Sequence, residues 1–262
     1  MYLTWLDNNS WLWEINGRRI LVDPWLVGDL VFLKAPWFFE GKNPHPHPIP
    51  GDIDLILLSQ GLPDHAHPET LRQMDRQIPV VASPNAAEVV TKLGYAQVTP
   101  LPAGKGFQLN NTIGIRAVPG AAIGPFLTEN AYILTDLATG LTLYYEPHGF
   151  PDDSLDAFAP IDVVITPVAD LTVPMAGPII QGYQTAVDLA KRVRPQVMLP
   201  TTEGGNVQYT GLLAQILNRA GGADTVRAQL ADACPETRFL TPRPGDRTEI
   251  VLTPYRTAAP KG

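Results

Sequence analysis

The pattern of apolar and polar residues predicts that the chain opens with a hairpin. Residues 10–15 and 19–22 have the composition of two strands. Between them stands Asn16-Gly17, the pair that most strongly favours a tight hairpin turn, because both residues tolerate a positive φ. Residues 55–58 then form an uninterrupted apolar run, which is typical of a strand buried on both faces.

After residue 60 the pattern alternates between short apolar runs and amphipathic stretches. Together with residues 2–6, these runs predict strands at 80–82, 112–118, 130–135, 141–145, 163–167, 196–199, 239–240 and 248–252. The amphipathic stretches predict helices at 68–77, 85–93, 182–193, 212–219 and 223–233. A hairpin sheet followed by alternating helices and strands, twice over, indicates two packed sheets with helices on both outer faces. We therefore expect an α+β fold, a four-layer αββα sandwich, with residues 1–262 in a single domain.

Composition narrows the class of protein. The chain has 262 residues, 45% of them hydrophobic, which is enough for one sizeable core. The net charge of −7 offers no positive field to nucleic acid, so no nucleic-acid partner is expected. A single cysteine, Cys234, excludes an internal disulfide and a thiolate metal cluster. The N-terminus lacks the pattern of a signal peptide, and no stretch approaches the roughly 20 apolar residues of a membrane span, so we expect a soluble cytoplasmic protein.

Residues 25–50 are expected to form an aromatic and proline-rich flap. A loop this long inside a compact domain is usually functional or mobile. Its residues Trp37, Phe38 and Phe39 fit two interpretations. They pack into the core, or they form an exposed apolar patch that contacts a lipid-like ligand, a membrane surface or a protein partner. Prolines alternate with His45 and His47, so that part excludes regular structure, and both histidines are expected to be exposed.

The candidate chemistry follows the buried strand at 55–58. Polar side chains at the carboxyl end of such a strand face a crevice, where layered α/β proteins commonly bind ligands. The residues there read Ser59-Gln60-Gly61-Leu62-Pro63-Asp64-His65-Ala66-His67. A strand, a serine and a loop ending in Asp-His resemble the His-x-His-x-Asp-His loop of the metallo-β-lactamase superfamily.

Other segments extend this resemblance over nearly the whole chain. Ile20-Leu21-Val22-Asp23-Pro24-Trp25 resembles the hairpin exit of the lactonase-like and phospholipase-like branch of that superfamily. Three later segments fall where the branch keeps its downstream motifs: Val118-Pro119-Gly120, Leu143-Tyr144-Tyr145 and Val197-Met198-Leu199-Pro200. Each segment alone is weak evidence for the resemblance, but the order and spacing of the segments together are specific to this branch.

The resemblance implies a dinuclear metal site that has lost most of its ligands. Asp64 and His65 match the family pattern, and Glu146 stands at the place of the bridging aspartate. The four histidine positions of the family are replaced, in chain order, by Gln60, Leu62, Ala121 and either Thr201 or Thr202. Leucine cannot coordinate a metal, and glutamine and threonine are weak ligands for zinc. Because a catalytic zinc needs about three protein ligands, the family's two-metal hydrolysis is disfavoured.

Two interpretations of the remaining ligands stay open. Asp64 and His65 form a buried carboxylate–imidazole pair that stabilises the strand exit, or they are catalytic residues of a reduced site. Such a site would hold one divalent ion (zinc, iron or manganese) on the metal ligands Asp64, His65, Glu146 and His148, with His67 as a further candidate. Asp23 is expected to brace the hairpin exit.

Three functions follow from these interpretations. The first is a repurposed, non-catalytic member whose crevice holds a small-molecule or lipid-like ligand or a protein partner. The second is a hydrolase with a mononuclear site that acts on a phosphoester, a lactone or an amide. The third is a hydrolase whose complete ligand set lies at positions other than those aligned above. Ser59 lacks the Gly-x-Ser-x-Gly elbow, which argues against a serine hydrolase.

Overall fold

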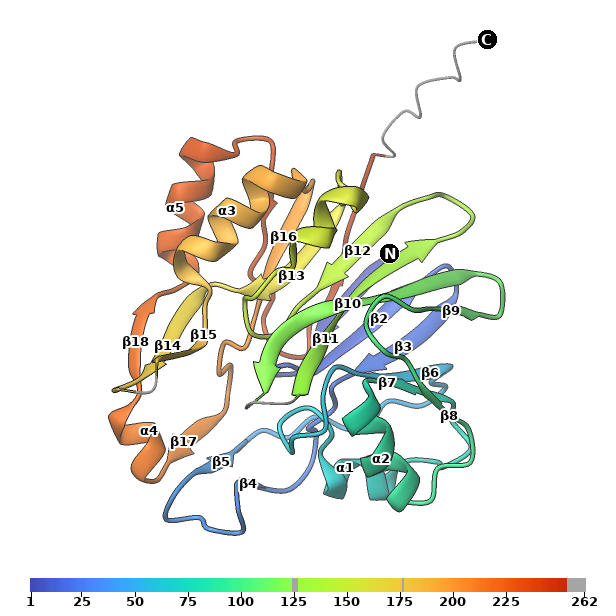
Figure 1. Cartoon of the computed structure of the whole chain (residues 1–262), viewed down its shortest axis with the longest axis vertical. Helices are drawn as coiled ribbons and strands as arrows, with labels where there is room; N and C mark the ends of the chain where they lie inside the picture. The colour runs from blue at the N-terminus through green and yellow to red at the C-terminus, as the bar shows by residue number, and fades with distance from the viewer. Residues whose placement is uncertain (124–126, 176, 254–262) are drawn as a thin grey trace.

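The computed structural model describes residues 1–123, 127–175 and 177–253. Two seven-stranded sheets lie face to face at its centre. Helices cover the outer face of each sheet (Figure 1). This arrangement confirms the αββα sandwich expected from the sequence.

The first sheet has the strand order β20-β1-β2-β3-β6-β7-β8. These strands are β1 (Tyr2–Trp5), β2 (Trp11–Ile15), β3 (Arg18–Val22), β6 (Leu55–Leu58), β7 (Val80–Ala82), β8 (Val98–Pro100) and β20 (Arg247–Glu249). The expected hairpin is confirmed, because β2 and β3 pair antiparallel around Asn16 and Gly17, whose φ angles are 47° and 72°. Strands β3, β6 and β7 run parallel, so their carboxyl ends meet at one edge of the sheet.

The second sheet has the strand order β19-β16-β13-β12-β11-β10-β9. These strands are β9 (Gly106–Leu109), β10 (Ile113–Ile123), β11 (Leu127–Asp136), β12 (Thr142–Tyr145), β13 (Val163–Pro167), β16 (Val197–Thr201) and β19 (Arg238–Phe239). The antiparallel β10–β11 pair is longer than the sequence predicted, and its register shifts between Pro119 and Ala122. Such a bulge bends the strand and re-aims the side chains next to it.

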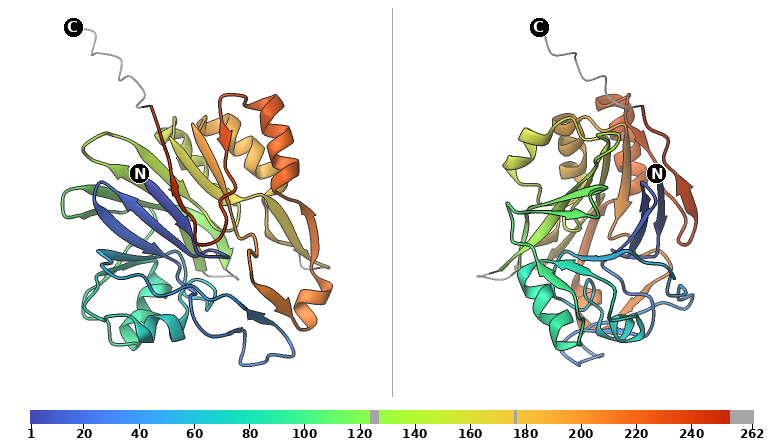
Figure 2. Two further views of the ribbon diagram at one scale, coloured as in Figure 1. Left: turned by 180° about the vertical axis from the view of Figure 1, so that it is seen from behind. Right: turned by 90° about the vertical axis from the view of Figure 1, so that its right-hand side faces the viewer.

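The outer layers consist of helices on both faces, which Figure 2 shows from two further sides. Helices α1 (Pro68–Gln73) and α2 (Pro84–Lys92) pack on the first sheet. Helices α3 (Tyr183–Val193) and α5 (Ala223–Ala233), with the short 3-10 helix η1 (Asp153–Phe158), pack on the second. Two helices end before their predicted limits, because the residue after each last turn is extended: Met74 after α1, and Leu217 after α4 (Leu212–Ile216).

Two small sheets lie beside the sandwich. One contains β14 (Ala169–Val173), β15 (Gly177–Ile180) and β18 (Asn218–Gly221), and the other contains β4 (Leu30–Val31), β5 (Glu40–Lys42) and β17 (Gln208–Thr210). The flap at 25–50 is therefore partly regular, since β5 pairs with β17 from the far end of the chain. These strands were not predicted, because strands of two or three residues carry almost no periodicity.

The main core fills the space between the two large sheets. Side chains alternate along each strand, so Leu55 and Leu57 face this core while Ile56 and Leu58 face the helices α1 and α2. All four are fully buried, as the apolar run predicted. The carboxyl ends of these strands form the edge of the sandwich where the candidate chemistry lies.

Candidate functional site

The carboxylate of Asp23 accepts hydrogen bonds from residues of both large sheets, at the edge where the carboxyl ends of β3 and β6 lie. Asp23 follows β3 and is completely buried. It accepts hydrogen bonds from the Ser59 backbone N–H at 2.7 Å and from the Ser59 hydroxyl at 2.6 Å. The Tyr145 hydroxyl, at the end of β12 in the second sheet, donates to it over 2.7 Å, and Nδ1 of His65 lies 2.9 Å away. The sequence indicated a brace at this position but not the contact with His65.

Asp64 and His65 lie together in the loop after β6. His65 is fully buried, and its Nε2 lies 3.3 Å from Oδ2 of Asp64 and 3.4 Å from Nδ2 of Asn9. Because Nδ1 donates to Asp23, Nε2 is the ring nitrogen that faces the site. Burial opposes a charged ring, but the carboxylates of Asp64 and Asp23 outweigh it and raise the pKa of His65 well above its usual value. Burial likewise opposes the charge on Asp64, yet the facing His65 ring lowers the pKa of Asp64.

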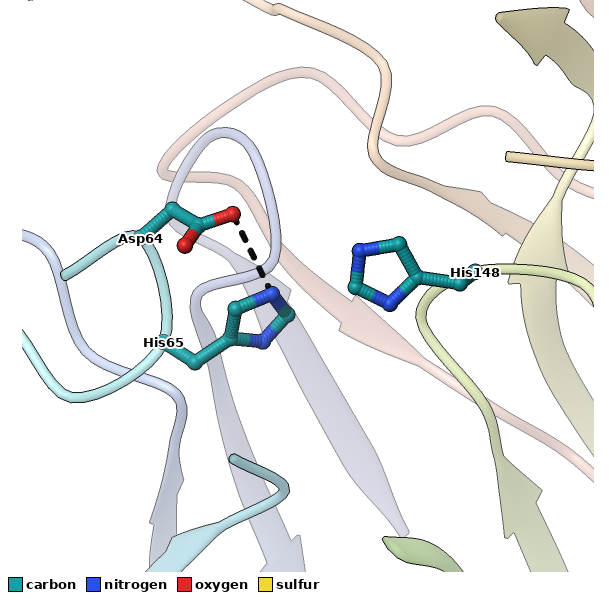
Figure 3. Close-up of side chains that lie close together, drawn as sticks. All are labelled: Asp64, His65 and His148. Atoms are coloured by element: carbon teal, nitrogen blue, oxygen red, sulfur yellow. Dashed lines mark ion pairs between the residues drawn. The ribbon is translucent and has the colours of Figure 1, made fainter. Parts of the chain in front are cut away.

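His148 approaches the same point from the second sheet. It lies in the loop after β12, and its ring centroid is 5.2 Å from that of His65 (Figure 3). Its Nδ1 lies 2.8 Å from Oε2 of Glu129, so Nε2 is the nitrogen left to face Asp64 and His65. Each of these three residues offers one ligand atom, and the three atoms lie within 4.8 Å of one another.

Glu146 belongs to a second group, with Glu129 and His148, whose ligand atoms also lie within 4.8 Å. Its oxygens, however, accept backbone N–H groups of its own loop: those of His148 and Phe150, both at 3.0 Å, and that of Gly149. Burial and the neighbouring Glu129 carboxylate raise the pKa of Glu146 well above its usual value. Burial opposes ionisation of Glu129 too, but His148 outweighs it and lowers the pKa of Glu129. The two neighbouring carboxyl groups therefore differ in environment, because His148 faces Glu129 whereas Glu146 faces the Glu129 carboxylate.

Two buried oxygens at this site have no hydrogen-bond partner in the described part of the chain. They are Oδ1 of Asp64 and Oε1 of Gln60. An unpaired buried acceptor costs free energy, about 1–3 kcal/mol, and a cation beside Asp64 would remove that cost. Two imidazoles and one carboxylate are a common donor set for zinc and for iron. The residues that are present fit one divalent ion between Asp64, His65 and His148.

Three of the positions that the sequence analysis aligned with family histidines, Gln60, Ala121 and Thr202, make hydrogen bonds at this site. Gln60 donates from Nε2 to Oε2 of Glu129 over 3.1 Å, and the Ala121 backbone N–H donates to Oε1 of Glu129 over 3.2 Å. The Thr202 hydroxyl lies 2.8 Å from Oδ1 of Asn9 and 2.6 Å from the Pro147 carbonyl. Sequence reasoning missed Glu129, which stands one residue before the predicted strand at 130–135. Its neighbours Thr128 and Asn130 are polar, so the apolar pattern carried no signal that would have found it.

The remaining candidate histidines lie apart from the Asp64–His65–His148 group. His67 is the N-cap of helix α1, and its Nδ1 accepts a hydrogen bond from the Thr70 backbone N–H at 3.3 Å. His45 is exposed, as expected. His47 is not, because it is part-buried with Nε2 2.9 Å from Oδ2 of Asp7. Asn43 donates to the same Asp7 oxygen over 2.7 Å, so the proline-rich part of the flap is fixed to the turn between β1 and β2.

The three aromatic residues of the expected patch, Trp37, Phe38 and Phe39, have different environments. The Trp37 side chain is 72% exposed, whereas Phe38 and Phe39 are half-buried. Phe39 stacks on Tyr209 of β17 with ring centroids 5.5 Å apart. Contact with a membrane, a lipid-like ligand or a partner through this region stays a prediction, and Trp37 is the side chain best placed for it. Among the described residues, no helix has the length and apolar character needed to cross a membrane.

The family model described as "Beta-lactamase superfamily domain" matches residues 2–202. No curated protein matches the sequence. Among solved structures, an isothiocyanate hydrolase from Delia radicum gut bacteria superposes with a TM-score of 0.73 at 15% identity, covering 95% of this chain and 99% of that one.

Two further structures are similar over the same span. A possible metal-dependent hydrolase from Veillonella parvula has a TM-score of 0.70 at 14% identity, and the metallo-beta-lactamase fold protein YhfI from Bacillus subtilis has 0.63 at 16% identity. In both cases the match covers 95% of this chain and 99% of the other. At these identities the structural likeness establishes the fold alone.

Proposed function

The chain belongs to the beta-lactamase superfamily, and on this basis we propose that it is a metal-dependent hydrolase that works with a single divalent ion. The observation that carries the proposal is the convergence of Asp64, His65 and His148 from two different sheets, with their ligand atoms within 4.8 Å of one another. The unpaired buried Oδ1 of Asp64 supports it, because a cation is the partner that this oxygen lacks.

Each residue has a distinct part in this proposal. Asp64, His65 and His148 would hold the ion through one carboxylate oxygen and two imidazole nitrogens. When bound, the ion supplies a water of lowered pKa and hence a hydroxide near neutral pH. Asp23 keeps the Nδ1 proton of His65 in place, which leaves Nε2 available as a ligand, and such carboxylate–histidine pairs usually accompany metal-binding histidines. Phosphoesters, lactones and amides are the expected substrate classes, because each is cleaved by attack of hydroxide.

We infer that a second metal is not held at this site. The nearby group is centred on Glu129, whose oxygens accept hydrogen bonds from His148, Gln60 and Ala121. Leu62 has no donor atom in its side chain and is 39% exposed. A carboxylate whose acceptor positions are already occupied is a poor metal ligand. The side chains near Glu129 therefore do not provide enough ligands for a second metal ion.

Metal analysis of the purified protein tests the proposal. We expect one equivalent of zinc, iron or manganese per chain after titration and removal of excess ion, and a higher melting temperature in its presence. Asp64→Asn and His148→Ala should lower both occupancy and hydrolysis of model phosphoesters and lactones, whereas His45→Ala, an exposed histidine in the flap, should change neither. Substoichiometric metal with no gain in melting temperature would reject the hydrolase and favour the non-catalytic, ligand- or partner-binding alternative.

A further inference from the structure

We propose that Glu129 is a positioning residue that fixes the ring of His148 and keeps the Nδ1 nitrogen of that ring protonated. The consequence of this role for metal affinity rests on the proposed function, whereas its effect on the His148 ring does not. Glu129 belongs to β11, faces the site from the second sheet and is fully buried.

Three donors converge on the Glu129 carboxylate. They are Nδ1 of His148 at 2.8 Å, Nε2 of Gln60 at 3.1 Å and the Ala121 backbone N–H at 3.2 Å. An ionised carboxylate offers about four acceptor positions and no donor, so it satisfies this set completely. A glutamine in the same place would present its amide hydrogens to at least one of these three donors.

The backbone around Glu129 is shaped to admit this side chain. Residue 129 faces the bulge between Pro119 and Ala122, where β10 shifts register. A Cβ atom on Gly120 would lie 2.8 Å from Cγ of Glu129, so a larger residue at Gly120 would displace the glutamate. The Ala121 N–H that donates to Glu129 comes from the same bulge, which therefore serves to seat the carboxylate rather than to end the strand pairing.

The contact with Glu129 determines which of the two groups of ligand atoms the free nitrogen of His148 joins. His148 belongs to both groups, but its Nδ1 proton is committed to Glu129. The Nε2 nitrogen then faces Asp64 and His65 (Figure 3). Carboxylate–imidazole contacts of this kind orient metal-binding histidines, and their loss typically costs about 10- to 100-fold in metal affinity. The Asp23–His65 and Glu129–His148 pairs thus support the site from opposite sheets.

The experiment compares Glu129→Gln and Glu129→Ala with the wild-type protein by two readouts. The first is ring-nitrogen NMR of the protein without added metal, in which the Nδ1-bound proton of His148 is assigned by its loss in His148→Ala. The second is zinc titration. Asp162→Asn is the matched control, because Asp162 is also a buried carboxylate with three donors, but it lies at the amino ends of β12 and β13, away from the site.

We expect the wild-type protein to hold a slowly exchanging proton on Nδ1 of His148, and both Glu129 variants to lose it. Zinc affinity should fall about 10- to 100-fold in both variants and stay unchanged in Asp162→Asn. Retention of the protected Nδ1 proton in Glu129→Gln and Glu129→Ala would overturn the proposal, as would its absence from the wild-type protein. If the wild type binds no zinc, the proposal of a single-metal hydrolase is rejected, but the NMR comparison still tests the role of Glu129.

Discussion

Oδ2 of Asp23 lies 2.9 Å from Nδ1 of His65, although the two residues are 42 positions apart in the chain. Parallel pairing of β3 with β6 brings them together, because Asp23 and Ser59 leave neighbouring strands at the same edge of the sheet. His65 then turns back onto the carboxylate from the loop that follows. The orientation of a candidate metal ligand is therefore a property of the strand pairing, not of the loop alone.

Replacing Asp23 with asparagine should disturb His65 more than it disturbs the fold. Only one atom of an asparagine side chain accepts hydrogen bonds, so the four donors at Asp23 cannot all be satisfied. We expect zinc affinity to fall about 10- to 100-fold, as is usual when the carboxylate behind a metal-binding histidine is lost. Calorimetric titration measures it.

Tyr145→Phe is the matched control for Asp23→Asn. It removes one donor to Asp23 but leaves the carboxylate and its contact with His65. We expect a loss of about 1–2 kcal/mol in the free energy of unfolding, with little change in metal affinity. Equal metal affinities in Asp23→Asn and Tyr145→Phe would contradict the role given to Asp23.

Gly149→Ala should destabilise the loop that carries His148. Gly149 has a φ of 82°, and an added Cβ would lie on top of the Gln181 carbonyl oxygen. Gly140→Ala is the control, because Gly140 has a φ of 75° but open space around it. We expect about 1–2 kcal/mol of backbone strain in Gly140→Ala and clearly more in Gly149→Ala. Chemical denaturation measures both variants. Equal losses in the free energy of unfolding would show that the loop at Gly149 moves to accommodate the added Cβ without cost.

The contact between Asp7 and the flap predicts a specific dependence of stability on pH. Burial opposes the charge on Asp7, but hydrogen bonds from His47, the Asn206 N–H and Asn43 lower the pKa of Asp7 below its ordinary 3.8. A carboxyl group with a lowered folded-state pKa stabilises the protein above the unfolded pKa, and this stabilisation is lost as the pH falls through the folded value. We expect Asp7→Asn to cost about 1.5–3 kcal/mol near pH 7.

The difference between wild type and Asp7→Asn should shrink as the pH falls below about 3.8, the ordinary pKa of Asp7. Unfolding by urea at a series of pH values tests this. Asp52→Asn, which removes an exposed carboxylate and makes the same change in net charge, should show no such difference at any pH. A gap between wild type and Asp7→Asn that stays constant down to low pH would rule out a role for the Asp7 charge.

Replacement of the flap aromatics Trp37 and Phe39 should have different effects on the free energy of unfolding. Trp37 is 72% exposed, so Trp37→Ala should change the free energy of unfolding by less than about 0.5 kcal/mol. Phe39 packs on Tyr209, so Phe39→Ala should cost about 1–3 kcal/mol. Thermal denaturation measures both, and a large loss in Trp37→Ala would mean that this side chain is covered in solution.

The sequence predicted the layers of the fold because their signals are local. The apolar run at Leu55–Leu58 and the Asn16-Gly17 turn each determine the structure over a few residues. The alignment to the family also placed Asp64 and His65 among the candidate ligands, and His148 was a candidate because it stands two residues after Glu146. The structure brings these three together.

The contacts around those ligands could not be predicted in the same way. Glu129 reaches His148 only because β10 bulges opposite it, and a bulge leaves little trace in the apolar pattern. Asp23 carries no local sign that it will contact a residue 42 positions away. Glu146 was expected as a ligand from its alignment, but the backbone N–H groups that occupy its oxygens depend on the turn at Gly149.

The order of synthesis has a consequence for how this site is assembled. Asn9 near the N-terminus contacts His65, and its side chain also meets Thr202, which is 193 residues further along the chain. A nascent chain therefore exposes Asp64 and His65 long before His148 and β16 leave the ribosome. Under the proposed function, an ion could bind at all three ligands only after the two sheets have docked, so it would stabilise the finished fold rather than nucleate it.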